Sequence, residues 1–162
     1  MAGRVWKFGD DVNTDVLAPG IYIKLPLEDL ASHCLEAVEP NFASYVQDGD
    51  IVVGGVNFGM GSSRAQAAQV LKALGVAAVI APSFGGIFYR NAFNLGLPAI
   101  VSNEIDQIAA EQELKIVLKT GVIENITTGK QLAGEAVPEN LMDLVEAGGL
   151  VPYLEQKLNK KG

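Results

Sequence analysis

The pattern of hydrophobic and polar positions alternates between two periods along the first two thirds of the chain. Runs typical of strands are either apolar throughout or alternate apolar with polar residues. They cover residues 5–8, 51–53, 76–81 and 99–101. Between them, apolar residues recur at every third or fourth position, as on one face of a helix. These helical stretches run from Leu27 to Val38, from Ala67 to Leu74 and from Phe84 to Leu95. Strands that alternate with helices favour a parallel sheet with crossover helices.

The last third of the chain has a different pattern. Residues 114–118 and 122–126 flank a short polar turn and predict a β-hairpin. Pro138 begins a final helix, which Gly148-Gly149 ends. No linker or low-complexity segment separates these parts. We therefore expect a single α/β domain over residues 1–162, with the hairpin and final helix, about 112–157, as part of it.

The composition excludes several classes of function. A formal net charge of −7 argues against a nucleic-acid or anionic-membrane surface, which needs basic residues. Cys34 is the only cysteine and His33 the only histidine, so the chain forms no internal disulfide and no Cys/His metal site, and iron–sulfur ligation needs several thiolates. The N-terminus lacks the apolar core of a secretory signal, and no apolar run is long enough to span a membrane. We expect a cytoplasmic protein.

One glycine-rich segment, GGVNFGMGSSR at residues 54–64, lies between a predicted strand and a predicted helix. Three known glycine loops fail to match it. The Rossmann fingerprint requires a third glycine where Arg64 stands, and a hydrolase nucleophile elbow requires a glycine at the same position. A Walker A loop requires a Gly-Lys-Ser/Thr sequence that the chain lacks. The segment therefore belongs to none of these three classes.

What remains is a helix that begins near Ser62, Ser63 and Arg64. In one interpretation a serine caps the helix and the glycines form a tight turn. That interpretation leaves Arg64 unexplained, because the helix dipole disfavours a cation in the first turn. In the other, the helix N-terminus, the hydroxyls and the guanidinium bind a carboxylate or a phosphate. The residues favour anion binding and leave both interpretations open.

Other candidate residues carry weaker signals. The acidic run from Asp10 to Asp15 lacks the spacing of an EF-hand and is typical of a solvated turn. Cys34 lies on the apolar face of its predicted helix and is expected in the core, whereas His33 lies off that face and is expected at the surface. The aromatic residues at 84–91 have helical spacing and are expected to pack in the core.

Three segments together resemble a known family, the small subunits of isopropylmalate isomerase. They are DVNTD at residues 11–15, NFGMGSSR at 57–64, and a third that comprises Ser83-Phe84, IFYRNA at 87–92 and Asn94. Their order and spacing match over about residues 4–101. The resemblance implies the three-layer β/β/α fold of the swivelling fourth domain of aconitase-type hydro-lyases.

The resemblance also implies a reaction and a partner. The family removes water from a 2-hydroxy dicarboxylic acid and adds it back with the hydroxyl on the neighbouring carbon, which converts 2-isopropylmalate to 3-isopropylmalate in leucine biosynthesis. A separate large subunit carries a 4Fe–4S cluster, one iron of which binds the substrate hydroxyl and carboxylate. The resemblance thus implies that this chain itself binds no cofactor, in keeping with its single cysteine.

Roles for individual residues follow from the same resemblance. Ser62 matches the serine that, as an alkoxide, takes the proton from carbon, and Asp15 matches an aspartate near that serine and the substrate. Arg64 matches the arginine that clamps a substrate carboxylate, and Ser63 lends a hydrogen bond. The other residues of the loop that we expect to bind substrate are Asn57 and Gly61.

Two departures from the family bear on the site. Family members usually follow Ser-Ser-Arg with Glu and then His or Gln, where this chain has Ala65-Gln66. The segment expected to select the substrate comprises Tyr22, Ile23, Lys24 and Leu25, and it lacks the Tyr-Leu-Arg type of signature of homoaconitate binders. Its apolar side chains suit an isopropyl or methyl group, whereas Lys24 suits an extra carboxylate. Isopropylmalate is the first expectation, with 2,3-dimethylmalate, citramalate and homoaconitate as alternatives.

A function of another class is a non-catalytic module of similar fold that binds a carboxylate or a phosphate. Asp15 together with Ser62 and Arg64 favours the enzyme, because a simple anion binder needs no second positioned carboxylate. The sequence leaves the oligomeric state of the isolated chain open, a homo-oligomer included.

Overall fold

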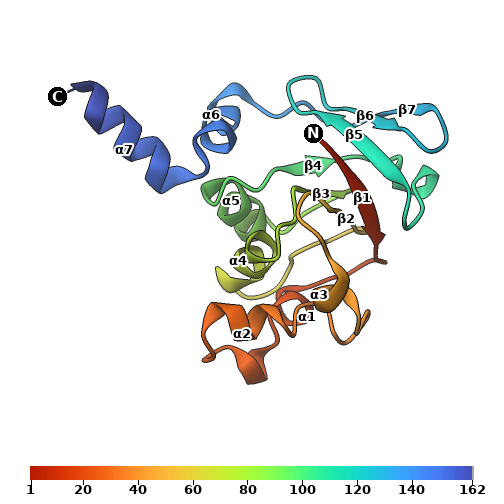
Figure 1. The fold of residues 1–162 in the computed structure, drawn as a ribbon, viewed down its shortest axis with the longest axis horizontal. Helices are drawn as coiled ribbons and strands as arrows, with labels where there is room; N and C mark the ends of the chain where they lie inside the picture. Colours follow the sequence, from red (N-terminus) through yellow and green to blue (C-terminus); the bar gives the residue numbers. More distant parts are fainter. Residues whose placement is uncertain (162) are drawn as a thin grey trace.

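A sheet of seven strands runs through the computed structural model, which describes residues 1–161 (Figure 1). Its strand order is β4-β3-β2-β1-β5-β6-β7. The strands are β1 (Ala2–Lys7), β2 (Ile51–Val53), β3 (Ala78–Ala81), β4 (Ala99–Val101), β5 (Glu113–Val117), β6 (Val122–Asn125) and β7 (Lys130–Ala133). Strands β1 to β4 are parallel, and β5 to β7 continue antiparallel from the other edge of β1. The first strand of the chain is therefore the central strand that joins two half-sheets.

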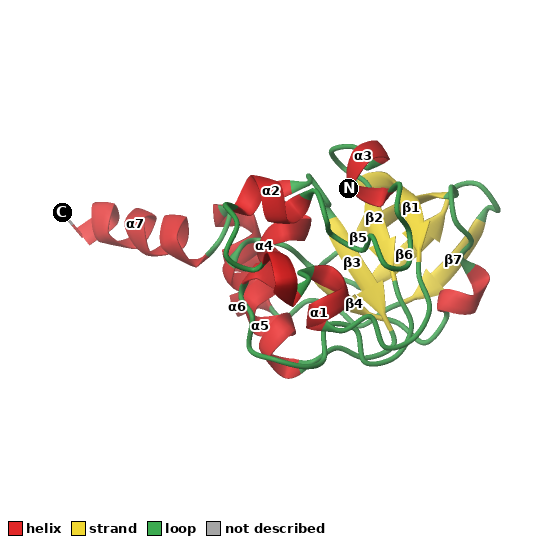
Figure 2. Cartoon of the chain, turned by 90° about the horizontal axis from the view of Figure 1, so that it is seen from below, coloured by secondary structure: helices red, strands yellow, loops and turns green. Residues whose placement is uncertain are grey.

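Helices pack against the parallel half-sheet, and loops at the ends of its strands lead into them (Figure 2). The elements between β1 and β5 are α1 (Thr14–Leu17), η1 (Gly20–Tyr22), α2 (Leu27–Ala31), α3 (Phe42–Tyr45), α4 (Gln66–Ala73), α5 (Gly86–Asn94) and η2 (Ile105–Gln107). Two helices, α6 (Glu139–Ala147) and α7 (Leu150–Lys161), follow β7. Helix α7 projects from the rest of the chain (Figure 1).

The sheet curls so that its two halves share a core. Ile51 and Val53 of β2 belong to this core together with Leu114 of β5. Val52 lies between them in sequence, points to the opposite face and packs in a second core with the helices. The three β2 side chains are fully buried, because the parallel half-sheet is covered on both faces. The layers are therefore β/β/α, as the sequence resemblance implied.

The predicted alternation of strands and helices is confirmed, but one predicted helix is shorter than expected and one helix, α7, was not predicted. The helix expected from Leu27 to Val38 ends at Ala31 and continues as turns, in which the N–H groups of His33 and Cys34 donate to carbonyls three residues earlier. Leu35 then adopts a φ of +61°, outside the helical region. The helix expected from Pro138 is confirmed as α6, including its end at Gly148-Gly149, and a helix that was not predicted, α7, follows it. Gly148 adopts a left-handed φ of +89° and ends α6, after which α7 begins as a separate helix.

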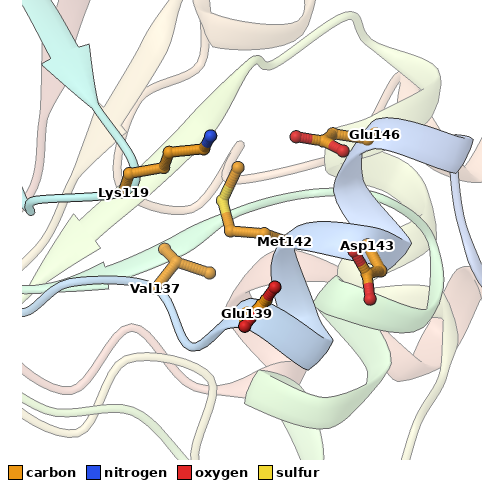
Figure 3. Close-up of a pocket in the computed structure, with 6 residues that line it drawn as sticks. All are labelled: Lys119, Val137, Glu139, Met142, Asp143 and Glu146. Carbon is orange, nitrogen blue, oxygen red and sulfur yellow. The ribbon is translucent and has the colours of Figure 1, made fainter.

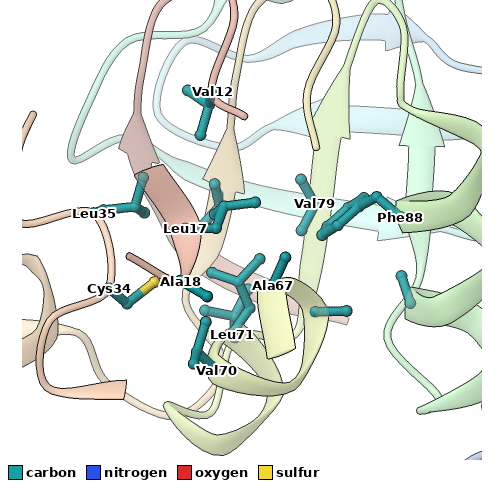
Figure 4. Packing of buried hydrophobic residues seen from close by; sticks show 14 of the residues in the cluster. Val12, Leu17, Ala18, Cys34, Leu35, Ala67, Val70, Leu71, Val79 and Phe88 are labelled. Atoms are coloured by element: carbon teal, nitrogen blue, oxygen red, sulfur yellow. The ribbon is translucent and has the colours of Figure 1, made fainter. Parts of the chain in front are cut away.

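Leu71 of α4 is fully buried in the core between the helices and the sheet, near Leu17 and Cys34 (Figure 4). We expect Leu71→Ala to lower the free energy of unfolding by about 2–5 kcal/mol, because neighbours on several elements cannot collapse into the cavity. Urea unfolding followed by circular dichroism measures the change. Leu27→Ala, the same truncation at an exposed leucine, is the control, and we expect it to change stability by about 0.5 kcal/mol or less. Equal losses at both positions would contradict this account of the core.

Candidate functional site

The glycine-rich segment at residues 54–64 follows β2 and leads to α4, and two of its glycines combine a positive φ with a close contact. Gly59 has a φ of +76°, and a Cβ there would lie 2.3 Å from the ring of Phe88. Gly61 has a φ of +123°, and a Cβ there would lie 2.8 Å from Oγ1 of Thr14. A side chain at either position would force the loop away from α5 or from α1. The glycines thus let the loop pack tightly against two other elements.

The same loop is hydrogen-bonded along its length to the segment that follows β1. The backbone N–H of Asp11 donates to the carbonyl of Val56 over 2.9 Å, and that of Thr14 donates to the carbonyl of Met60 over 2.9 Å. The side-chain amide of Asn57 donates to the Asp11 carboxylate over 3.2 Å. These bonds bring the motifs DVNTD and NFGMGSSR, far apart in sequence, side by side.

Thr14 holds Ser62 through two contacts. The backbone N–H of Ser62 donates to Oγ1 of Thr14 over 3.1 Å, and the two hydroxyl oxygens lie 3.1 Å apart. Thr14 is only 4% exposed, whereas Ser62 is exposed. Either hydroxyl can donate to the other, and when Ser62 is ionised only the O–H of Thr14 can donate, to Oγ of Ser62. A hydrogen bond donated to that oxygen favours its ionised form.

Arg64 forms an ion pair with Asp15. Its Nη1 lies 3.0 Å from Oδ1 of Asp15 and also donates to the carbonyl of Ala18 over 3.1 Å. The N–H of Gly20 donates to the same carboxylate oxygen over 2.9 Å. Hydrogen bonds from Arg64 and then from Gly20 lower the pKa of Asp15. The carboxylate is therefore ionised at neutral pH and is available to orient the guanidinium.

The contribution of this pair to stability has a defined pH dependence. It is complete above the unfolded-state pKa of aspartate, about 3.9, and is lost as the pH falls through the lowered folded-state pKa. The Asp15 side chain is 68% exposed, so water and salt screen the pair. The ion pair therefore serves mainly to hold Arg64 in place and contributes only slightly to the stability of the fold.

Helix α4 begins later than the sequence indicated. Its first residue is Gln66, and its N-cap, Ala65, offers no side-chain hydrogen bond. Neither Ser62 nor Ser63 is the N-cap, and Arg64 precedes the first turn, so the expected helix start and the helix-dipole argument built on it were wrong. The physical reason is tertiary. Bonds from Ser62 and Arg64 to the segment after β1 hold these residues outside the helix.

The segment expected to select the substrate begins directly beside the guanidinium of Arg64. Gly20, the first residue of η1, lies so close that a Cβ there would be 3.1 Å from Nη2 of Arg64. The four residues of the segment follow, two half-buried and two exposed. The half-buried residues are Tyr22 and Ile23, and the exposed ones are Lys24 and Leu25. The sequence-predicted segment thus adjoins the predicted carboxylate clamp.

A stacked pair of rings supports this segment from behind. The rings of Tyr22 and His33 are nearly parallel, with centroids 3.7 Å apart. Nδ1 of His33 lies 2.8 Å from the carboxylate of Glu36. His33, expected at the surface, is half-buried by this stack, whereas Cys34 is fully buried as predicted. Burial strongly raises the pKa of the Cys34 thiol, which keeps it protonated.

A shallow hollow of about 210 Å³ opens beside Ser62. Backbone of the glycine loop and of Gly85 and Gly86 at the start of α5 lines it, with Met60 and Ile87 at its sides. A larger hollow of about 440 Å³ lies beside α6 and contains none of the predicted site residues (Figure 3). Size alone therefore does not identify the site, whereas the side-chain chemistry gathers around Ser62.

The structure brings most of the sequence-predicted site residues together on two adjoining segments. Ser62, Gly61 and Arg64 contact the segment that carries Asp15, and Asn57 is tied to the same segment. Thr14 is the residue that sequence reasoning missed. Its only signal was its place inside the DVNTD motif, because a buried threonine in an acidic run has no pattern of its own.

Comparisons with known proteins agree with this placement. The family model described as the aconitase C-terminal domain matches residues 30–105. The 3-isopropylmalate dehydratase small subunit 1 of Thermotoga maritima is 49% identical over 156 residues, which cover 95% of this chain and 94% of that protein. The chain belongs to the family of 3-isopropylmalate dehydratase small subunits. The resemblance inferred from the sequence motifs is therefore confirmed.

Relatives within this family of dehydratase small subunits are named for different substrates. The isopropylmalate/citramalate isomerase small subunit of Methanocaldococcus jannaschii is 49% identical, over 96% of this chain and 94% of that protein. The methanogen homoaconitase small subunit of Methanothermobacter thermautotrophicus is 48% identical, over 93% and 88%. A crystal structure described as 3-isopropylmalate dehydratase from Methanocaldococcus jannaschii matches with a TM-score of 0.92 at 42% identity, over 99% of this chain and 98% of that one. The shared designation as small subunits implies a large-subunit partner.

Two negative findings complete the description of this family member. Within residues 1–161, no three His, Cys, Asp or Glu side chains lie close enough together to hold a metal ion. Over the same residues, no helix has the length and apolarity needed to cross a membrane.

Proposed function

We propose that this chain is the small subunit of a two-chain hydro-lyase that isomerises 2-isopropylmalate to 3-isopropylmalate by dehydration and rehydration. The observation that carries the proposal is the pairing of Ser62 with Thr14 beside the Arg64–Asp15 ion pair. This arrangement combines a hydroxyl primed to ionise with a positioned carboxylate clamp, in a chain of this family. An anion-binding module would need the clamp alone.

Ser62 is assigned as the base that removes the proton from carbon. A serine hydroxyl is a poor base at its ordinary pKa and must be activated by its surroundings. The O–H of Thr14, donated to Oγ of Ser62, supplies part of that activation. Ser62 is exposed at the hollow, so a substrate carbon can reach its oxygen. In the reverse step, in which water is added back, the same oxygen returns the proton to the carbon.

Arg64 is assigned as the clamp for a substrate carboxylate. Its bonds to Asp15 and Ala18 both use Nη1, which leaves other donors of the guanidinium fork for a bidentate contact. Removal of a proton beside that carboxylate builds negative charge, which the guanidinium stabilises. Ser63, Asn57 and Gly61 are assigned to hold the substrate along the loop.

Departure of the substrate hydroxyl is assigned to the partner. The residues of this chain do not fit an iron–sulfur cluster, since Cys34 is the only cysteine and lies fully buried in the core. We assign the 4Fe–4S cluster to the large subunit, which closes over the open side of the hollow beside Ser62. Half of the active site then belongs to each chain.

Selection among substrates is assigned to Tyr22, Ile23, Lys24 and Leu25. Leu25 offers an exposed apolar surface for an isopropyl or methyl group, whereas exposed Lys24 offers a cation for an additional carboxylate. The names of two relatives favour citramalate and homoaconitate as second candidates. The third alternative substrate is 2,3-dimethylmalate, a chemical analogue of isopropylmalate. Ala65 presents no carboxylate at the edge of this site.

The test of this function is reconstitution with the large subunit. The purified pair is assayed for dehydration of 2-isopropylmalate, 2,3-dimethylmalate, citramalate and homoaconitate, and kcat/KM is compared. We expect the highest value for 2-isopropylmalate. A higher value for another acid would reassign the substrate. Tight ligand binding by the chain alone, with no turnover of any of the four acids by the pair, would establish the binding module instead.

Thr14→Val should slow turnover of the reconstituted enzyme. We expect kcat to fall about 10–100-fold with little change in KM, because Ser62 loses a charge-assisted hydrogen bond of about 1.5–3 kcal/mol. The rise of kcat with pH should also move to higher pH, since the Ser62 alkoxide becomes harder to form. Thr14→Ser is the matched control and should restore both properties. A pH profile identical to the wild type in Thr14→Val would remove Thr14 from this role.

A further inference from the structure

His33 is the only histidine of the chain, and its ring packs behind the segment that we assign to select the substrate. The imidazole lies nearly parallel to the ring of Tyr22, with the centroids 3.7 Å apart and the planes at 11°. Tyr22 and Ile23 also pack against the core, but apolar contact has no preferred direction. The stack therefore determines the plane of the Tyr22 ring, because aromatic pairs have a defined geometry.

The rest of this segment lies at the surface and forms local hydrogen bonds. The backbone N–H groups of Tyr22, Ile23 and Leu25 donate to carbonyls that are only three residues earlier. Ile21 is 84% exposed, and Lys24 and Leu25 are exposed as well. Local bonds and exposed side chains are typical of a segment that moves at low cost in free energy. The position of the segment thus depends on the contacts that its two half-buried residues make.

The turns that carry His33 are fixed to the core and to α1. Cys34 and Leu35, the next two residues, are fully buried in the core (Figure 4). The backbone N–H of Leu35 donates to the carbonyl of Val16 in α1 over 3.1 Å. Nδ1 of His33 lies 2.8 Å from Oε2 of Glu36. An ionised carboxylate only accepts, so the ring N–H donates to it and this bond limits rotation of the imidazole.

Helix α1 is therefore a common support for the carboxylate clamp and for the substrate-selecting segment. It carries Asp15, whose carboxylate accepts a hydrogen bond from Arg64 over 3.0 Å. Through Val16 it also holds the turns that place His33 against Tyr22. The spacing between the clamp and Tyr22 is thus set by the folded chain before substrate binds. An acid held at Arg64 then presents its side group at a defined place relative to Tyr22.

We propose that His33 is a positioning residue that determines which side groups the enzyme accepts, an inference that rests on the proposed function. His33 acts through Tyr22, whose ring it holds in the plane that fits the apolar group of an acid bound at Arg64. Loss of the imidazole opens space behind Tyr22, so that the ring turns away and its contact with an isopropyl group weakens. The methyl group of citramalate has less apolar area to bury and loses less.

Steady-state kinetics of His33→Ala, reconstituted with the large subunit, test this role. We expect the KM for 2-isopropylmalate to rise about threefold to tenfold, the range typical of an aromatic pair, while kcat stays within about twofold of the wild type. The KM for citramalate should change by less than about twofold, so that selection between the two acids weakens. A variant that is merely less well folded would instead lose kcat at an unchanged KM, since fewer molecules are active.

Two further variants identify the stack as the cause. His33→Phe keeps a flat ring against Tyr22 and should return the KM for 2-isopropylmalate to within about twofold of the wild type. Val38→Ala truncates an exposed residue in the same turns and is the matched control, with both KM values expected to stay unchanged. If His33→Phe selects no better than His33→Ala, the stack is not the cause and the proposal is wrong.

NMR of the isolated chain tests the stack without turnover. Because the chain has a single histidine, its imidazole gives one set of signals. We expect through-space cross-peaks between these signals and a tyrosine ring, and we expect Tyr22→Leu to remove them. Their absence from the wild type overturns the proposal. If the wild-type pair turns over none of the acids, the proposed function fails, and the role of His33 in selection fails with it. An active wild type with an unchanged KM in His33→Ala contradicts the role of His33 alone.

Discussion

Ser62→Ala, reconstituted with the large subunit, is expected to lose about 10²–10⁴-fold in kcat while its KM stays close to that of the wild type. The substitution removes the oxygen that we assign as the base. It leaves the backbone N–H of residue 62 free to donate to Thr14, so the loop keeps its position. The exposed hydroxyl contributes little to the core, and the midpoint of urea unfolding should not change. Initial rates give kcat and KM, urea unfolding gives the stability, and capture of the large subunit gives the assembly of the pair.

Ser63→Ala is the matched control for this experiment. Ser63 is the adjacent serine and is equally exposed, so its loss removes one hydrogen bond to the substrate and no base. We expect a fall in kcat/KM of about tenfold or less. Substantial turnover by Ser62→Ala, or equal losses in the two variants, would exclude Ser62 as the base. Loss of partner capture in Ser62→Ala would instead show that this hydroxyl is needed for assembly.

Arg64→Gln is expected to reduce kcat/KM by about 10²–10³-fold, equivalent to about 3–4 kcal/mol, mainly through a higher KM. Glutamine keeps a hydrogen-bonding side chain but loses the charge and the fork that suit a carboxylate. Asp15 loses its first hydrogen-bond donor, so its pKa should rise toward the usual value for aspartate. Steady-state kinetics give the first result, and a carboxyl-carbon NMR titration of the chain gives the second.

Arg4→Gln separates this effect from a general loss of positive charge. Arg4 lies on β1 over the ring of Trp6 and contacts none of the site residues. We expect its removal to leave kcat/KM within about threefold of the wild type, since surface charges at a distance are screened by salt. An unchanged KM in Arg64→Gln would eliminate the carboxylate clamp. An unchanged Asp15 pKa would eliminate the ion pair as its cause.

Much of the fold could be predicted because its parallel strands are covered on both sides. Such strands read as unbroken apolar runs, and residues 51–53 and 78–81 are fully buried in the structure. The helix expected after Leu27 could not be predicted correctly in length. Leu30, Cys34 and Leu35 have helical spacing, yet a short helix followed by turns buries all three completely. The spacing of apolar residues predicts which side chains face the core, and it does not predict the backbone conformation between them.

The sequence predicted which residues of the candidate site lie close together and did not predict their geometry, and the roles of these residues stay predictions. The motif around Ser62 identified the loop, and the structure places it against the motif around Asp15 as the resemblance implied. The helix start was misplaced because bonds to a distant segment outweigh local capping, and sequence patterns register only the local part. The contact of Thr14 with Ser62 could not be predicted for the same reason, because the two residues are 48 positions apart.

The central place of β1 has a consequence for how the chain is made. Of the seven strands, the central one is synthesised first, and β5, which pairs with its second edge, begins only at Glu113. Until then the N-terminal strand presents an unsatisfied hydrogen-bonding edge, the kind of surface that recruits strands of other chains. Non-local pairing of this sort also slows folding. The nascent chain is therefore exposed to aggregation until β5 has been synthesised, and conditions that shorten that interval should raise its soluble yield.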